Sequence, residues 1–158
     1  MTEKITTCLW FYTQAEEAAD FYVSVFDDSK ILNVARYGDV GPGTAGQAMT
    51  VEFEIEGRKF LGLNGGPAFT FTEAVSFVIN CSSQEEVDRY WTALTAGGSE
   101  GQCGWLKDKF GLSWQVVPSA MGQLLGGPDH EGAQRAMQAM LGMRKLVISE
   151  LQAAYDGA

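Results

Sequence analysis

Hydrophobic and polar residues follow the same pattern twice along this chain, and each time the pattern predicts a strand and then a helix. The stretches 5–12 and 74–80 are rich in β-branched and aromatic residues, which is typical of strands. In the segment after each stretch, apolar residues recur at i, i+3, i+4 and i+7, which predicts an amphipathic helix. The residues expected to face the core are Ala18, Phe21, Tyr22 and Val25 in the first helix and Val87, Tyr90, Trp91 and Leu94 in the second.

The two copies correspond without a gap when Ser76 is placed over Thr7 and Glu85 over Glu16. Sequences of the capping-box type precede both helices, Thr13-x-x-Glu16 in the first copy and Ser82-x-x-Glu85 in the second. This regular correspondence indicates an internal repeat of one folding unit.

Three further strands are expected in each copy. In the first copy they cover 30–37, 48–55 and 58–64, and residues 48–55 alternate between apolar and polar side chains. In the second copy they are shorter and cover 100–103, 105–107 and 112–117. Each copy is therefore a βαβββ module, and the predicted fold class is α+β.

The last forty residues predict helices. Segments 119–125 and 149–155 are short, whereas Asp129 can cap a helix through residue 141 with an apolar side formed by Ala133, Met137, Met140 and Leu141. We expect residues 1–118 to form one domain of two modules, at about 1–67 and 74–118. Residues 119–158 are then a helical extension packed on this domain or on a partner subunit.

Composition narrows the possible partners and location. Of the 158 residues, 46% are hydrophobic and 20% are charged, which is typical of a globular protein. Eleven Lys and Arg against 20 Asp and Glu give a net charge of -9, which argues against nucleic acid or an anionic membrane as a partner. Three widely spaced cysteines, taken as buried thiols, and the lack of a long apolar segment favour the cytoplasm.

Two motifs have an ordinary structural interpretation. Segment 39–46 resembles a glycine-rich loop that binds S-adenosylmethionine, but an alternating strand pattern follows it where a helix would be required, so a hairpin connection is favoured. The only histidine, His130, stands at a helix start and is interpreted as a surface or capping residue.

Strand alternation predicts a face that could hold a small ligand. It places Trp10 and Trp114 on the sheet faces covered by the helices, and a mixture of aromatic and neutral polar residues on the opposite faces. The candidate ligand-binding residues are Thr7, Phe11, Phe60, Asn64, Ser76 and Gln115. The alternative, that this face is only sheet core with paired polar groups, stays open.

Several segments resemble the PhnB-like branch of the vicinal oxygen chelate superfamily, which includes glyoxalases, bleomycin-resistance proteins and extradiol dioxygenases. The segment 104–118, with its Trp-Leu-Lys-Asp-Lys-Phe-Gly sequence, carries the resemblance most specifically, and 15–22, 63–67 and 133–155 extend it. The resemblance implies two modules forming a glyoxalase/bleomycin-resistance/dioxygenase-like cupped mixed sheet, and a homodimer. Some members of this branch are labelled demethylubiquinone methyltransferase.

In metal-dependent members of this superfamily, ligands come from the first and last strands of a module. The matching positions are Thr7, Ser76, Gly62 and Gln115, and only Gln115 could ligate a metal, weakly. No cofactor, metal residue or catalytic residue is therefore assigned, and the favoured function is binding of an unknown small molecule at a degenerate metal site. A metal-dependent isomerase, lyase or dioxygenase is the alternative, and a methyltransferase is a remote one.

Overall fold

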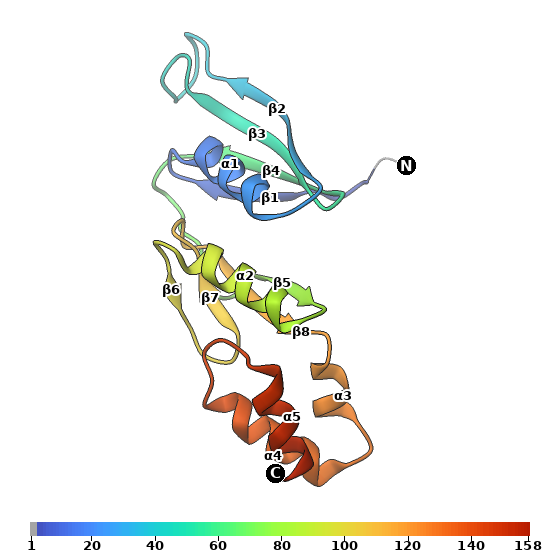
Figure 1. Ribbon diagram of the computed structural model, residues 1–158. Helices are drawn as coiled ribbons and strands as arrows, with labels where there is room; N and C mark the ends of the chain where they lie inside the picture. Colours follow the sequence, from blue (N-terminus) through green and yellow to red (C-terminus); the bar gives the residue numbers. More distant parts are fainter. Residues whose placement is uncertain (1–2) are drawn as a thin grey trace. The chain divides into compact units, whose positions relative to one another are not determined.

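The computed structural model describes residues 3–158. The chain divides into two compact units, the first ending at Phe71 and the second beginning at Thr72. Each unit contains one mixed four-stranded sheet with a helix packed on it, and the second also contains three C-terminal helices (Figure 1).

In the first unit the predicted elements are present in the predicted order. They are β1 (Thr7–Phe11), α1 (Ala15–Val25), β2 (Ser29–Arg36), β3 (Ala48–Ile55) and β4 (Arg58–Asn64). The sheet order is β1-β4-β3-β2, in which β1 and β4 are parallel and the other pairs antiparallel.

The second unit repeats this topology with shorter strands. It comprises β5 (Ser76–Cys81), α2 (Gln84–Thr95), β6 (Ser99–Glu100), β7 (Trp105–Lys107) and β8 (Ser113–Pro118), in the sheet order β5-β8-β7-β6. The parallel pair is now β5 and β8. The predicted pair of βαβββ modules is therefore confirmed.

An aromatic core lies between α1 and the first sheet. Tyr22 of α1 stacks on Phe53 of β3, which stacks in turn on Phe60 of β4. Phe53 and Phe60 are register partners and therefore point to the same face of the sheet. Both are buried, so this face is the one that α1 covers.

The predicted strand faces are wrong in the first unit. Thr7, Phe11, Phe60 and Asn64 share the face covered by α1, whereas Trp10, expected beneath the helix, points to the opposite face. The cause is one extra residue in a loop, because three residues separate β1 from α1 but only two separate β5 from α2. Relative to the helix that follows, β1 is therefore displaced by one residue compared with β5. Because side chains alternate along a strand, this displacement turns toward the helix the residues that were expected on the opposite face.

The helix starts also differ from the predicted capping boxes. In α2 the cap is Ser83, whose hydroxyl accepts a hydrogen bond from Glu86 N, while Ser82 N donates to the Glu86 carboxylate. In α1 the cap position is Gln14, which makes no side-chain capping bond. Instead Asn64 Oδ1 of β4 accepts the hydrogen bond from Ala15 N.

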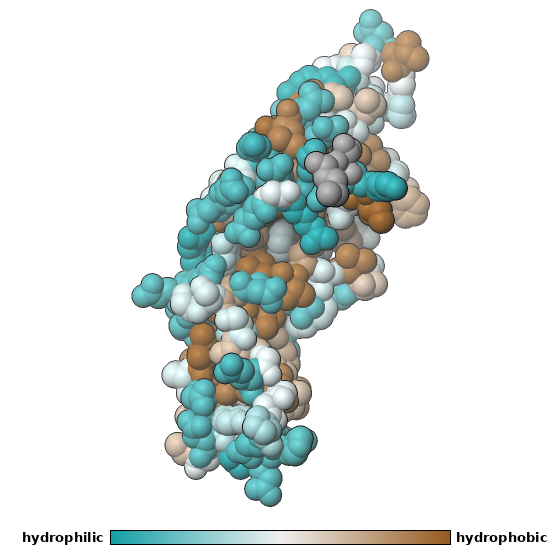
Figure 2. All heavy atoms as spheres, turned by 90° about the vertical axis from the view of Figure 1, so that its right-hand side faces the viewer, coloured by the Kyte–Doolittle hydropathy of each residue, from teal (hydrophilic) through white to brown (hydrophobic). Residues whose placement is uncertain are grey.

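The C-terminal helices pack together within the second unit. They are α3 (Met121–Gly126), α4 (His130–Leu141, capped by Asp129 as predicted) and α5 (Ile148–Asp156). Their core contains Met121, Leu124, Ala136, Leu146 and Leu151. The predicted apolar side of α4 is partly wrong, because Met137 and Leu141 are exposed and Ala136 is buried instead. The face seen in Figure 2 is mainly hydrophilic at the C-terminal helices.

Two further sequence predictions concern the burial of the cysteines and membrane-spanning segments. Cys81 is buried and Cys103 is half-buried, but Cys8 is exposed, so the prediction of three buried thiols is wrong for Cys8. Within residues 3–158, no helix combines the length and apolar character that crossing a membrane requires.

Candidate functional site

The face of the second sheet turned away from α2 carries a compact group of polar side chains. We call it the polar face and define it by Ser76, Val78, Trp105, Lys107, Ser113 and Gln115. The alternate residues Leu106, Trp114 and Val116 are buried on the side of α2.

Strand register arranges the polar face in two rows. In the first row Gln115 of β8 lies between Trp105 of β7 and Val78 of β5, and in the second Ser113 lies between Lys107 and Ser76. The first row thus combines one amide with two apolar side chains, and the second row is entirely polar.

Two interactions fix side chains on this face. Gln115 Nε2 donates a hydrogen bond to Ser76 Oγ over 3.0 Å, so these two predicted site residues lie side by side. The Lys107 ammonium forms an ion pair with the Glu73 carboxylate, and this hydrogen bond lowers the pKa of Glu73. Gln115 and Lys107 are therefore oriented before any ligand arrives.

Ser113 is the unusual member of the polar face. Its side chain is 1% exposed, and its Oγ is the buried side-chain nitrogen or oxygen that has no hydrogen-bond partner within the described part of the chain. Ser113 borders a surface hollow of about 300 Å³, which is also lined by Glu73, Ser99, Glu100, Gly101, Trp105, Leu106 and Lys107. Since buried polar groups in folded proteins are nearly always hydrogen-bonded, the unpartnered hydroxyl makes Ser113 a candidate site residue at this hollow.

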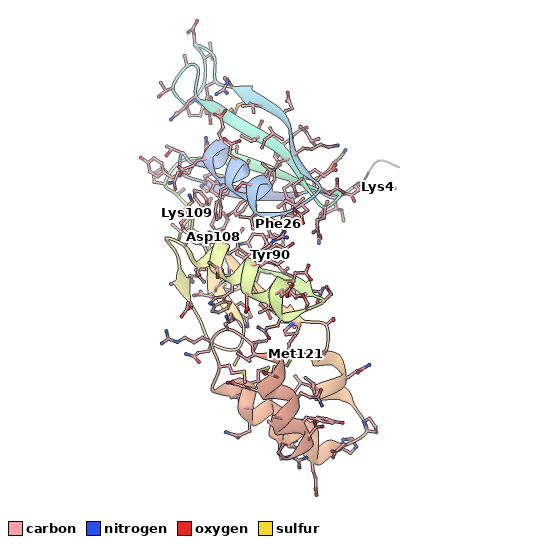
Figure 3. All side chains as sticks on the ribbon, in the orientation of Figure 1. Lys4, Phe26, Tyr90, Asp108, Lys109 and Met121 are labelled. Carbon is pink, nitrogen blue, oxygen red and sulfur yellow. The ribbon has the colours of Figure 1, made fainter. Side chains whose placement is uncertain are left out.

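The segment that carries the resemblance most specifically has a structural role. Asp108, in the turn between β7 and β8 (Figure 3), accepts hydrogen bonds from the backbone N–H groups of Phe110 and Leu112 and from Trp114 Nε1. Its side chain is buried and organises the turn. The Lys-Asp-Lys-Phe-Gly sequence therefore builds the turn that precedes β8, from which Ser113 and Gln115 project.

Three of the four predicted site residues of the first unit lie in its core, whereas Thr7 borders a surface hollow. Phe11 and Phe60 are buried beneath α1, and Thr7 is half-buried beside Phe60. Asn64 uses its amide internally, because Oδ1 accepts from Ala15 N and Nδ2 donates to Ala48 O. That any of the six predicted residues contacts a ligand stays a prediction.

The glycine-rich loop 39–46 is part of a hairpin connection. Tyr37 N donates to Gln47 O, and Gly46 N donates to Tyr37 O, so the loop closes between β2 and β3. A strand follows it, as predicted, and the loop therefore offers no helix N-terminus to the carboxylate of S-adenosylmethionine.

The ligand positions of metal-dependent superfamily members hold unsuitable donors. Ser76 and Gln115 supply a neutral hydroxyl and an amide, and Gly62 has no side chain and lies beneath α1, close to Ala15. Transition metals in proteins prefer imidazole, thiolate and carboxylate ligands. Across residues 3–158, no three His, Cys, Asp or Glu side chains are placed to hold a metal ion together. The donor set does not fit a divalent metal.

Sequence reasoning missed Ser113, Lys107, Trp105 and Glu73 as site residues. The alternation did place Ser113 on the correct face, but nothing in the sequence shows that its hydroxyl lacks a partner. The position of Lys107 and Trp105 follows from the β7–β8 register, which depends on the turn at Asp108.

Two mixed sheets of identical βαβββ topology are the fold of the vicinal oxygen chelate superfamily, and two solved structures similar to this chain share the fold. Protein PA1353 from Pseudomonas aeruginosa is 21% identical, with 74% of this chain and 98% of that one covered and a TM-score of 0.61. The fosfomycin resistance protein FosX from Listeria monocytogenes, complexed with Mn(II) and sulfate, is 13% identical, with 80% and 97% covered and a TM-score of 0.53. At these identities the similarity shows the fold.

The particular family follows from a closer match. Residues 3–117 match the family described as 3-demethylubiquinone-9 3-methyltransferase. A putative 3-demethylubiquinone-9 3-methyltransferase, the PhnB protein from Bacillus cereus, is 36% identical, with 74% of this chain and 100% of that one covered and a TM-score of 0.69. The chain therefore belongs to this family and is a PhnB-like member of the superfamily. No curated protein matches it.

Proposed function

We propose that this chain binds a small organic molecule on the polar face, without a metal ion. The observation that carries the proposal is the buried, unpartnered Ser113 hydroxyl at a surface hollow. Binding sites for small molecules combine apolar walls with a few fixed polar groups. Trp105 and Val78 supply the apolar part, and the Gln115 amide and the Ser113 hydroxyl supply the polar part.

The proposal includes no metal ion because the side chains at the corresponding positions are poor metal ligands. Neither Ser76 nor Gln115 is a strong ligand, and their hydrogen bond to each other already engages both side chains. The word methyltransferase in the family description has no support from the loop 39–46, which leads into β3. Neither a metal-dependent reaction nor methyl transfer is thus favoured by an observation at the site.

The test is an NMR titration of the full-length protein with three aromatic probes of different charge: benzamide, benzoate and benzylamine. We expect at least one probe to shift the Trp105 indole resonance and the Gln115 side-chain amide resonances. Gln115→Leu should weaken this binding, whereas Gln102→Leu, a matched change at an exposed residue, should leave it unchanged. If no probe perturbs the polar face, the proposed function is wrong.

The metal-free part is tested separately. Thermal unfolding of protein purified without chelator should be unaffected by Mn²⁺, Ni²⁺ or Zn²⁺, because a ligand that binds only the folded state raises the unfolding temperature. A rise with one of these ions that EDTA reverses would contradict the metal-free proposal.

The predicted homodimer is kept as a proposal, since the resemblance to the superfamily supports it. Sedimentation velocity should give a dimer of 17.1 kDa subunits. A monomer at micromolar concentration would contradict it.

A further inference from the structure

Resting on the proposed function, we infer that the polar face selects an uncharged molecule in which a carbonyl group is attached to an aromatic ring. Ser113 Oγ donates a hydrogen bond to the carbonyl oxygen, and Trp105 contacts the ring. Three features of the second unit lead to this ligand class.

The first feature is the position of the orphan hydroxyl. Register places Ser113 between Ser76 and Lys107, yet its Oγ bonds to neither of them. Ser76 Oγ already accepts from Gln115, and the Lys107 ammonium is held by Glu73. The Ser113 O–H is therefore a buried donor that needs an acceptor from outside the chain, and a carbonyl oxygen is such an acceptor.

The second feature is the pairing of the charges around the hollow. Lys107 pairs with Glu73, and the Glu100 carboxylate accepts a hydrogen bond from Trp91 Nε1 and lies 3.6 Å from the Arg144 guanidinium. A carboxylate ligand would have to compete with Glu73 for Lys107, and an ammonium ligand would have to compete with Lys107 for Glu73. A neutral ligand disturbs neither ion pair.

The third feature is the apolar row next to the hydroxyl. Trp105 is half-buried and borders the hollow, and Val78, in the same row, is 50% exposed. Aromatic rings prefer offset or edge-to-face contact with one another. Trp105 pairs with Gln115, and Ser113 lies in the next row of the same face. A ligand whose aromatic ring contacts Trp105 can therefore direct a carbonyl group on that ring toward Ser113.

The experiment compares the three probes, which share a benzene ring and differ in charge. Benzamide should bind at least fivefold more tightly than benzoate or benzylamine, measured by the shift of the Trp105 indole resonance. Ser113→Ala should weaken benzamide binding about fivefold, the effect of one hydrogen bond. Ser119→Ala, at an exposed serine just beyond β8, is the matched control and should change nothing.

Stability distinguishes an anchor hydroxyl from a structural one. Removing a buried hydroxyl without a partner should leave the unfolding temperature unchanged or raise it, so Ser113→Ala should bind benzamide more weakly while keeping its stability. Ser113→Cys, which retains a side chain of similar size but only a weak donor, should likewise keep its stability and bind benzamide more weakly than wild type.

The outcomes separate this inference from the proposed function. Tighter binding of benzoate or benzylamine at the polar face, or unchanged benzamide binding by Ser113→Ala, would overturn the inference while leaving the proposed function intact. Marked destabilisation by Ser113→Ala would also overturn it, because the hydroxyl would then have an internal role. Failure of all three probes to perturb the polar face would overturn both.

Discussion

The two units share one topology, but they differ in what their buried polar residues do. Within residues 3–158, the buried polar or charged residues are Asn64 in the first unit and Asp108 and Ser113 in the second. Asn64 and Asp108 have their hydrogen bonds satisfied by the chain itself, whereas the Ser113 hydroxyl does not. Buried polar groups are costly without a partner, so the contrast separates two residues that hold the fold from one whose hydroxyl the described chain leaves unsatisfied.

The two satisfied residues support different parts of the module. Asn64, at the end of β4, accepts a hydrogen bond from the first N–H of α1, which has no side-chain cap, and donates one to Ala48 of β3. Asp108 ties the β7–β8 turn to the indole of Trp114, while α2 is capped locally by Ser83. In the first unit a buried polar side chain thus stabilises the start of the helix, and in the second unit a buried polar side chain stabilises a turn between two strands.

The largest effect is expected from Asp108→Ala. It would leave two backbone N–H groups and the Trp114 indole N–H without their acceptor, and the loss should be about 3 kcal/mol or more of unfolding free energy. Urea unfolding would measure it. Asp108→Asn is the control and should lose less, because Oδ1 still accepts from both backbone groups. Equal losses in the two variants would contradict the role assigned to the carboxylate.

A smaller loss is expected from the matching residue of the first unit. Asn64→Ala removes the partners of Ala15 N and Ala48 O, and should cost about 2 kcal/mol. Asn64→Asp keeps the acceptor for Ala15 N but turns a second oxygen toward Ala48 O, so it should fall between wild type and Asn64→Ala. If Asn64→Ala proves as stable as wild type, the proposed dependence of α1 on β4 is wrong.

The same contrast explains what the sequence could predict. Hydrophobic periodicity predicted every strand of both sheets and the three C-terminal helices to within a few residues, because burial of apolar faces dominates folding. It could not predict the face of β1, since that depends on a single residue of loop length between Phe11 and Ala15. Composition carries no signal for a change of this size.

The predicted strand faces of the candidate residues are right in one unit and wrong in the other for the same reason. In the second unit, where the strand and helix are in the expected register, Ser76 and Gln115 do lie together on the face away from α2. In the first unit the shift by one residue placed Phe11, Phe60 and Asn64 in the core. Ser113 could not be singled out from sequence, because a missing hydrogen-bond partner is a property of three-dimensional packing.

A smaller change in unfolding free energy is expected from substitutions at the helix starts. Ser83→Ala removes the side-chain cap of α2 and should cost about 1 kcal/mol. Gln14→Ser, the matched change in the first unit, should gain less than this amount, because residue 14 (φ -107°, ψ 16°) lacks the extended backbone conformation (φ -151°, ψ 165°) from which the Ser83 hydroxyl reaches Glu86 N. Chemical denaturation of both variants provides the comparison. A gain from Gln14→Ser as large as the loss from Ser83→Ala would mean that the backbone conformation at residue 14 does not prevent capping.

A pH-dependent contrast concerns the buried cysteine at the end of β5, Cys81, and the exposed cysteine of β1, Cys8. Burial, with a further contribution from the Glu86 carboxylate, raises the pKa of the Cys81 thiol from its usual value near 9 to about 11. The unfolded chain therefore loses this proton at lower pH than the folded chain does. It follows that the contribution of Cys81 to stability is complete below pH 9 and declines as pH rises toward 11.

Comparison of wild type with Cys81→Ala isolates this contribution from the other groups that titrate in the same range. At pH 7.5 the variant should be less stable, because it leaves a cavity where a fully buried side chain packs. The difference should narrow between pH 9 and pH 11, since only wild type carries the thiol. Cys8→Ala is the matched control at the exposed cysteine of β1 and should show a smaller change with pH. A constant difference between wild type and Cys81→Ala over this range would show that Cys81 ionises equally easily in the folded and unfolded chains, and that the end of β5 is as open to water as an exposed strand.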